Sequence, residues 1–320
     1  TQSVDTSAGA TSLSLRLSEP TPQSSATTLN PTEDPDRFQS LTLSSQLGQA
    51  GVGLYFAAQP GPGARAGATL PTGSARLGVP QLSLLGPGDG VSAATNLGGS
   101  LNVFAGIHRA TPRAGGGDGT LAQAWISSPG PGGLGRIALG LGAVNENSSL
   151  FRTSASGAFG NIRRSQSQFL TLSAARPVTG NIDIFGAYTQ ATAKPDIGGG
   201  IISDWGTVHA SSFAVGVKGG DVWTTGDNLT LTFGQPLRVD RAQAALTMPV
   251  ARNGADGFHN ETRTVNAVPS GRELDLEISY GRAVSSGGNL TTMLGVATNP
   301  GHQANARPSA FAGLRFSAGF

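Results

Sequence analysis

The last twelve residues, from Ser309 to Phe320, alternate between apolar side chains and small or polar ones. Every second residue counted back from the C-terminus is apolar, namely Phe320, Ala318, Phe316, Leu314, Ala312 and Ala310. This period of two is that of a β-strand with one apolar and one polar face, and it does not fit a helix. The end of the chain therefore predicts a sheet with two unlike faces.

The same alternation recurs along the chain, most clearly from about residue 101 onward. Clear examples are residues 101–107, 137–141, 182–188, 213–217, 229–233, 274–280 and 290–296. A tilted strand of about 9–11 residues is long enough to cross a bilayer. The chain has no apolar window of about 18 residues, so the sequence predicts no membrane-spanning helix. With the aromatic C-terminus, the pattern predicts an all-β fold: a closed antiparallel up-and-down transmembrane β-barrel. We expect about 12 strands, with 14 possible, since bacterial barrels favour even numbers.

Connections of two lengths separate the predicted strands. Short Gly-rich turns, as at 179–181, 219–220 and 285–288, alternate with long polar stretches such as 194–210 and 252–270, which we expect to be loops. Residues 19–37 and 59–76 read as loops for the same reason. Short turns on one rim and long loops on the other are typical of outer-membrane barrels. We divide the chain into an N-terminal segment, 1–40, with an early strand and a Pro/Ser/Thr-rich loop, and a barrel domain, 41–320.

The composition narrows the alternatives. Only 12% of the residues are charged, against roughly 25% in average domains, and 48 are glycine. The chain has no cysteine, which excludes disulfides and thiolate sites, and its net charge of +2 gives nucleic-acid binding little support. A soluble β-sandwich or a secreted β-rich interaction module stays open, because soluble antiparallel sheets alternate too.

Three carboxylates share one face of a predicted strand, at Glu273, Asp275 and Glu277. Carboxylates facing lipid are costly, so we expect them in the barrel lumen, with Arg16 and Arg315 as partners. They would either line a pore or hold the shape of the barrel through ion pairs. Four scattered histidines suggest no metal site, and we expect no cofactor and no catalytic residue. The Trp and Tyr residues, among them Trp125, Trp223 and Tyr280, are candidates for interfacial girdles.

Five motifs near the C-terminus carry a family resemblance, with Tyr280 following the fourth. They are Gly-Asp-Asn-Leu at 226–229, Gly-Gln-Pro-Leu-Arg-Val at 234–239, Met-Pro-Val at 248–250, Val-Pro-Ser-Gly-Arg-Glu-Leu-Asp-Leu-Glu at 268–277 and Asn-Pro-Gly-His at 299–302. In this order they resemble the C-terminal region of subtilisin-like serine peptidases that Gram-negative bacteria export as autotransporters. The resemblance implies a translocator barrel in the outer membrane that exports or anchors an N-terminal peptidase passenger. The peptidase signatures Asp-Ser-Gly, His-Gly-Thr and Gly-Thr-Ser-Met-Ala are missing from this chain, so we expect it not to be an enzyme.

The implied partners are outer-membrane lipid, the barrel-assembly machinery and the chain's own passenger. The assembly machinery would read the terminal strand at Leu314, Phe316 and Phe320. Because the first residues resemble neither a start nor a signal peptide, we expect a longer precursor. Three alternatives stay open: a porin-like channel for small solutes, a secreted module and a barrel hydrolase. A passenger encoded before Thr1 would favour the translocator.

Overall fold

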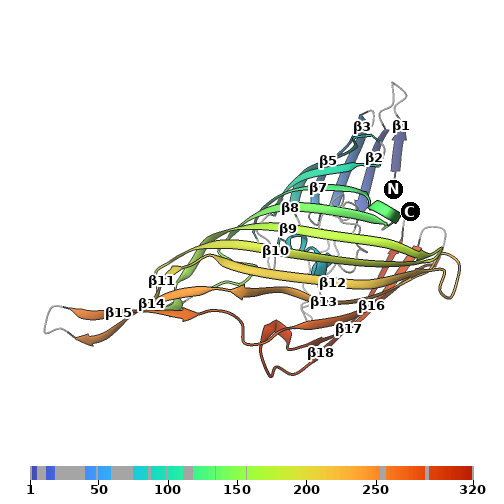
Figure 1. Cartoon of the computed structure of the whole chain (residues 1–320). Helices are drawn as coiled ribbons and strands as arrows, with labels where there is room; N and C mark the ends of the chain where they lie inside the picture. The colour runs from blue at the N-terminus through green and yellow to red at the C-terminus, as the bar shows by residue number, and fades with distance from the viewer. Residues whose placement is uncertain are drawn as a thin grey trace.

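A computed structural model describes most of the chain. It covers residues 2–5, 12–18, 40–47, 50–58, 75–85, 88–98, 100–110, 118–133, 135–155, 157–252, 257–284 and 288–318. Side chains are described from Leu77 onward, except those of residues 289, 315, 317 and 318. Within these ranges nearly all regular structure is antiparallel β-sheet (Figure 1).

One large sheet contains 15 strands, and each strand pairs with its neighbours along the chain. They are β1 (Gln2–Asp5), β2 (Ser12–Ser18), β3 (Ser40–Leu47), β4 (Ala50–Ala58), β5 (Gly88–Asn96), β6 (Asn102–Ala110), β7 (Gly119–Pro129), β8 (Arg136–Asn147), β9 (Asn161–Thr179), β10 (Ile182–Gly198), β12 (Val208–Gly220), β13 (Asn228–Arg241), β16 (Leu274–Ala283), β17 (Gly288–Thr298) and β18 (Ser309–Ala318). Apart from the four-residue edge strand β1, they form an up-and-down meander of 14 strands. The all-β meander is confirmed, and its strand number is the higher of the two predicted values.

A second, three-stranded sheet consists of β11 (Ile202–Trp205), β14 (Gln243–Arg252) and β15 (Phe258–Asn266). In Figure 1, β14 and β15 project beyond the ends of the long strands. These strands, with the extension of β10 to Gly198, show that the loops predicted at 194–210 and 252–270 were wrong for much of their length. The signal was missing because these segments are rich in polar residues and glycine, and their few apolar residues do not recur at a period of two.

The connections alternate in length, as predicted. Short turns join β3 to β4, β5 to β6, β7 to β8, β9 to β10, β12 to β13 and β16 to β17, and the longer connections all lie at the opposite end of the strands. The rim with the short turns and the rim with the long loops are called the turn rim and the loop rim below.

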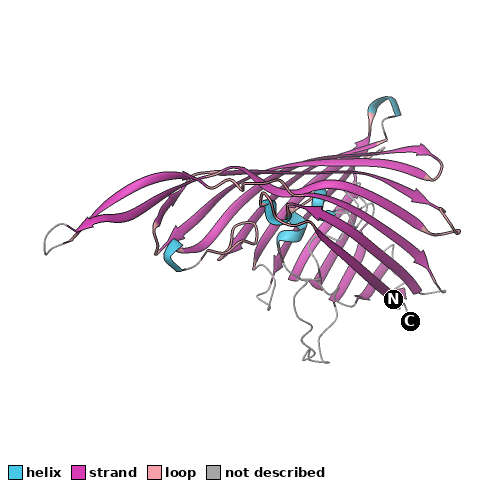
Figure 2. Cartoon of the chain, turned by 90° about the horizontal axis from the view of Figure 1, so that it is seen from below, coloured by secondary structure: helices cyan, strands magenta, loops and turns pink. Residues whose placement is uncertain are grey.

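The large sheet is strongly curved, as the two views in Figures 1 and 2 show. Its strand order ends at β1 and at β18, and no pairing between these two strands occurs among the described residues. The predicted closure is therefore not part of the observed pairing.

Two one-turn helices, α2 (Ala75–Gly78) and α3 (Gln81–Leu84), lie on the concave side of the sheet (Figure 2). The sequence did not reveal them, because four residues are too few to show a helical period. Within the described ranges, no helix is long and apolar enough to span a membrane.

The outer face of the sheet is unlike that of a soluble protein. On the convex face large apolar side chains are exposed, such as Leu141 at 56%, Leu172 at 54% and Leu276 at 50%. On the concave face small polar side chains such as Thr171 and Thr189, both at 0% exposure, are buried beside apolar ones such as Phe169. A soluble sheet would carry polar residues on its exposed face. An apolar outside and a polar inside are characteristic of a transmembrane barrel.

Candidate functional site

The concave face of the sheet carries the polar groups from which a lumen could be built. Its buried polar residues include Gln123, Ser127, Ser165, Ser167, Thr171, Ser173, Thr189, Ser212, Thr230, Thr232, Asp275 and Glu277. They reach this face because successive strand residues point to opposite sides, so one polar residue in two lines the interior. The result is a hydroxyl-rich surface whose strand carboxylates are Asp275 and Glu277 on β16 and Glu146 at the loop end of β8.

Two of these carboxylates stand on β16. Asp275 and Glu277 are 0% and 5% exposed, and in the strand register they lie opposite Gly234 and Thr232 of β13. The third carboxylate of the predicted set, Glu273, lies just before the strand and joins the loop rim instead: its Oε2 accepts a hydrogen bond from the Gly301 N–H at 2.7 Å. The structure therefore brings two of the three carboxylates together.

The other predicted site residues lie partly beyond what is described. The backbone of Arg16 pairs with Thr42 and that of Arg315 with Thr291, but the side chains of both arginines lie outside the described set. Leu314 and Phe316, predicted to act in assembly, are 73% and 59% exposed. The third assembly residue, Phe320, also lies outside the described residues.

The segment 75–85, between β4 and β5, packs against the inner face. Leu77, Val79, Leu82, Leu84 and Leu85 are all at most 5% exposed. The last four form one apolar cluster with inward aromatic residues of the sheet, among them Phe104, Trp125 and Phe169. Burying apolar side chains contributes about 1.5–3 kcal/mol each, so this segment is held firmly inside the curve of the sheet.

A chain of hydrogen bonds fixes the same segment to β9 and β10. The Thr189 hydroxyl donates to the Gly78 carbonyl at 2.8 Å, so its oxygen accepts from the Thr171 hydroxyl at 2.7 Å. The Thr171 oxygen in turn accepts from the Gln81 side-chain N–H at 3.3 Å. The donor and the acceptor of each hydrogen bond in the chain are thus defined. A buried chain of this kind specifies a single position for the segment.

Inward aromatic rings also lie over glycines of the neighbouring strand. Trp125 of β7 covers Gly140 of β8, where an added Cβ would lie 2.5 Å from the ring. Phe185 of β10 covers Gly216 of β12 in the same way. Such a ring replaces the side-chain contacts that glycine lacks and locks the register of the pair. Trp125 is 2% exposed and faces inward, so its predicted place in an interfacial girdle was wrong.

Two buried carboxylates organise connections at opposite rims. At the loop rim, Glu146 accepts hydrogen bonds from the Phe151 and Arg152 backbone N–H groups, both at 2.8 Å. At the turn rim, Asp227 accepts from three backbone N–H groups, at 2.6–3.0 Å, and from the Tyr280 hydroxyl at 3.1 Å. Burial raises the pKa of Asp227, but these donors outweigh it and hold the pKa below its usual value.

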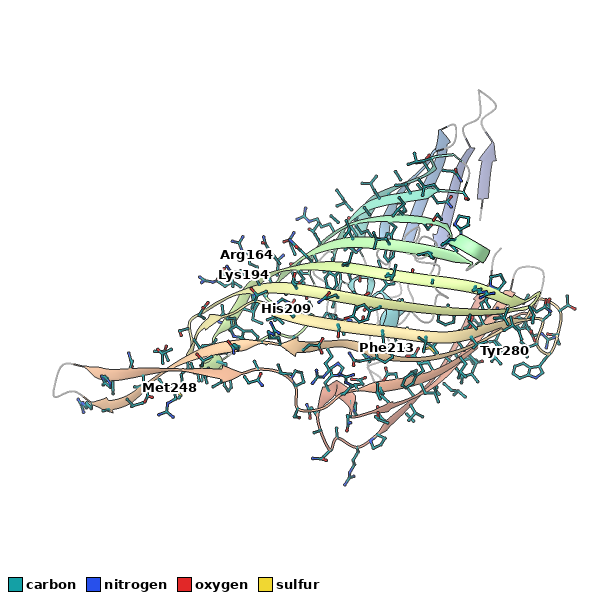
Figure 3. All side chains as sticks on the ribbon, in the orientation of Figure 1. Arg164, Lys194, His209, Phe213, Met248 and Tyr280 are labelled. Carbon is teal, nitrogen blue, oxygen red and sulfur yellow. The ribbon has the colours of Figure 1, made fainter. Side chains whose placement is uncertain are left out.

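Trp223 lies beside Asp227 at the turn rim, 65% exposed, with its ring centroid 5.0 Å from that of Tyr280. Figure 3 shows Tyr280 at this end of the molecule. An exposed Trp and a Tyr that share one rim match the predicted aromatic girdle on this side.

Three of the five C-terminal motifs, those at 234–239, 268–277 and 299–302, meet in space at the loop rim, centred on His302. This histidine is 8% exposed; its Nδ1 accepts a hydrogen bond from the Glu273 N–H at 2.9 Å, and its Nε2 lies 3.1 Å from the Leu237 carbonyl. Because one nitrogen faces a donor and the other an acceptor, the pattern fits neutral imidazole with the proton on Nε2.

Backbone and arginine contacts complete this arrangement, called the His302 cluster below. The His302 carbonyl accepts from the Gly271 N–H at 2.7 Å, and the Arg238 guanidinium donates to the Gly271 and Pro269 carbonyls at 2.9 and 3.1 Å. Burial lowers the pKa of His302, and the positive charge of Arg238 acts in the same direction. The Leu237 carbonyl and the carboxylates of Glu273 and Asp240 act the other way, less strongly overall. The sequence marked these residues only as motif members, without a role.

Chemical sites other than these were sought among the described residues. No group of three or more His, Asp or Glu side chains there could hold a metal ion. The functional features that the sequence did not predict are the internal segment 75–85 and the buried His302, Glu146 and Asp227.

Comparisons with known proteins find similarity only among solved structures. No family model matches the chain, and no curated protein is similar to it. Among solved structures, OprB of Pseudomonas putida at high pH aligns with a TM-score of 0.48 and 12% identity, over 88% of this chain and 72% of that chain. An anion-selective porin from Comamonas acidovorans aligns with a TM-score of 0.45 and 13% identity, over 86% of this chain and 84% of that chain. The autotransporter resemblance stays a prediction.

Proposed function

We propose that this chain forms an outer-membrane β-barrel that conducts small polar solutes. The observation that carries this proposal is the apolar outer face of the sheet, with exposed Leu and Val outside while Ser and Thr are buried inside. An exposed apolar face is stable in lipid, and a polar concave face is stable around water. A backbone N–H or C=O group that is unpaired in lipid costs free energy. In the membrane the first and last strands of the meander would therefore pair and close the barrel.

The interior suits a narrow aqueous path. Hydroxyl groups of Ser and Thr line the concave face, together with the carboxylates of Asp275 and Glu277. The segment 75–85 occupies part of the space inside the curve and is tied down at Gln81 and Gly78. We propose that it narrows the path and so limits the size of the solutes that pass.

The second candidate is the translocator of an autotransporter, which the C-terminal motifs support. The internal segment argues for the channel over the translocator. It belongs to the connection between β4 and β5, both of its ends are fixed to the sheet, and it stands where a passenger polypeptide would have to pass. Neither candidate needs a catalytic group, and labelling by a phosphonate probe for serine hydrolases would contradict both.

Conductance in a planar lipid bilayer tests the channel. The purified full chain should give discrete conductance steps. Thr189→Val removes the hydroxyl that holds the Gly78 carbonyl, so its steps should become larger or noisier. Thr192→Val, on the outer face of the same strand, is the matched control and should leave the steps unchanged. A full chain that stays in the aqueous phase without detergent would refute the membrane location itself.

A fusion tests the translocator. An epitope-tagged domain is placed before Thr1, and intact cells are treated with protease. Loss of the epitope from intact cells, together with silent bilayer recordings, would favour the translocator over the channel.

A further inference from the structure

The convex face of the sheet carries a groove of about 920 Å³ that the proposed function does not use. It crosses from β5 to β12, and its exposed walls include Val91, Ile107 and Leu170. Its volume lies near the upper end of the range for small-molecule pockets, roughly 300–1,000 Å³. The floor of the groove is made of small side chains such as those of Ala105, Ala122 and Ala143, and larger residues stand at its sides.

The groove changes character along its length. One line of cross-strand neighbours runs through it: Val91, Ile107, Ala122, Ala143, Gln168, Thr192 and His209. The first four are apolar or small and the last three are polar. At the β5 end the line lies within the apolar belt. At the β12 end it reaches the loop rim, since Val208 is the first residue of β12.

Basic side chains gather at the polar end of the groove. Arg241 pairs with His209 in the strand register, and Lys194 lies two residues beyond Thr192 on the same face of β10. Figure 3 shows Lys194, His209 and Arg164 at the same end of neighbouring strands. Among the described residues, neither Lys194 nor Arg241 has an ion-pair partner.

The acidic groups of β10 and β13 at this end are already engaged. Asp196 is shared between Arg163, at 3.2 Å, and Arg164, at 4.0 Å. Asp240 pairs with Arg238 at 3.0 Å. The polar end of the groove therefore keeps an excess of positive charge in Lys194 and Arg241.

We propose that this groove holds an acyl chain of a phosphate-bearing lipid of the outer leaflet, with the lipid phosphate on Lys194 and Arg241. The proposal rests on the proposed function, an outer-membrane barrel; in such barrels the long loops lie at the outer surface, which would place the loop rim there. An apolar trough that ends at two cations matches a lipid, whose chain is apolar and whose head is anionic. Arg241 can hold a phosphate through two parallel hydrogen bonds, and Lys194 adds a point charge.

A protein partner fits the groove less well. Its floor is made of alanines, whereas protein interfaces concentrate their binding energy in buried aromatic and arginine anchors set into pockets. A flexible acyl chain can follow a shallow trough across several strands, which a folded partner cannot do. A second copy of the chain in the groove is an outcome that the experiment would reveal.

Native mass spectrometry of the full chain in neutral detergent tests the proposal. Lipid A, which carries phosphates and acyl chains, is titrated against phosphatidylcholine, whose phosphate is neutralised by choline. Lipid A should be retained in preference. The double variant Lys194→Gln/Arg241→Gln should weaken its retention by roughly fivefold for each cation removed. Lys218→Gln, which removes the chain's other lysine near the turn rim, is the matched control and should change nothing.

The trough is tested separately with Ala122→Phe, which fills it with a ring. This variant should lower the retention of both lipids, whereas the double charge variant should spare phosphatidylcholine. If Ala122→Phe does not fold, Ala143→Phe makes the same test one strand further along. Inorganic phosphate at concentrations that saturate simple anion sites should not displace lipid A; displacement would show a free-anion site and overturn the proposal.

Two further results would overturn it. One is that the full chain retains the two lipids equally and that the double variant retains them to the same extent. The other is a change of oligomeric mass in Ala122→Phe without a change in lipid retention, which would assign the groove to a second copy. Conductance of the same variants separates this proposal from the channel: a variant that conducts normally but fails to retain lipid A leaves the channel intact.

Discussion

Acidification should loosen the loop rim by protonating His302. In the folded protein its Nδ1 accepts the Glu273 N–H at 2.9 Å and its Nε2 faces the Leu237 carbonyl at 3.1 Å. A proton on Nδ1 would face another N–H, so one hydrogen bond is lost and a buried donor is left unpaired. That costs about 1–3 kcal/mol, and attraction from Glu273 and Asp240 offsets part of it.

The sign follows from the direction of the pKa shift. Burial lowers the pKa of His302 below its ordinary value of about 6.5. At pH values between the lowered pKa of the folded state and the ordinary pKa, the unfolded state binds more protons than the folded state. The free energy of unfolding therefore rises with pH in that interval. The stabilising contribution of neutral His302 is therefore fully present above about pH 6.5, and it is lost as the pH falls through the lowered value.

Hydrogen exchange read by mass spectrometry measures the effect. The amide groups of Gly271, Gly301 and Ala304 donate within the loop rim, so they report its opening. After correction for the intrinsic pH dependence of exchange, opening should increase roughly 5- to 30-fold between about pH 7.5 and about pH 5; the upper limit is set by the roughly 1.5 pH units between the ordinary histidine pKa and pH 5.

His302→Gln should remove this pH response, because glutamine does not titrate. His259→Gln, at an exposed histidine of β15, should keep it. The reasoning fails if the corrected exchange of these amides is the same at both pH values, or if the response survives in His302→Gln.

Three more predictions concern the wall and the turn rim. Gly140→Ala should destabilise the fold by about 1–3 kcal/mol, because the new Cβ meets the Trp125 ring. The measurement is the temperature at which the protein loses its fast-migrating folded form on gels, which should fall. Gly142→Ala, whose Cβ would lie 3.4 Å from its nearest neighbour, is the control and should be nearly neutral. Ile278→Arg, on the convex face, should cost about 2–4 kcal/mol in a bilayer near its midplane, measured by urea unfolding in vesicles. Asp227→Asn should expose the turn rim to protease at neutral pH; since the pKa of Asp227 is lowered, the wild-type turn should keep its protection above about pH 3.9 and lose it as the pH falls through the folded value.

The sequence predicted the features that depend on the apolar period and missed those that do not. The strands around Leu139, Ile184 and Leu276 were found because one face must be apolar, and turn chemistry located the short connections between them. The segment 75–85 was missed because two single-turn helices leave no periodic trace. β15 was missed because both its faces are polar.

The candidate site was predictable in part for a similar reason. Alternation alone places Asp275 and Glu277 on the inner face of β16. It says nothing of His302, whose partners lie 29 and 65 residues away along the chain. The motifs containing His302, Glu273 and Leu237 were visible in the sequence, but only the three-dimensional structure shows that they meet.

The unequal length of the connections has an evolutionary consequence. Each long strand forms hydrogen bonds only with the strands next to it in the meander. The register of each hairpin is therefore set by the turn that joins its two strands. A residue inserted in a short turn, such as that between β9 and β10, would shift the hairpin by one position and turn its apolar residues toward the interior. An insertion between β17 and β18 on the other rim would lengthen a loop and leave the paired strands as they are. One rim can therefore diversify while the other must be inherited almost unchanged, which suits a protein whose outer surface meets a changing environment.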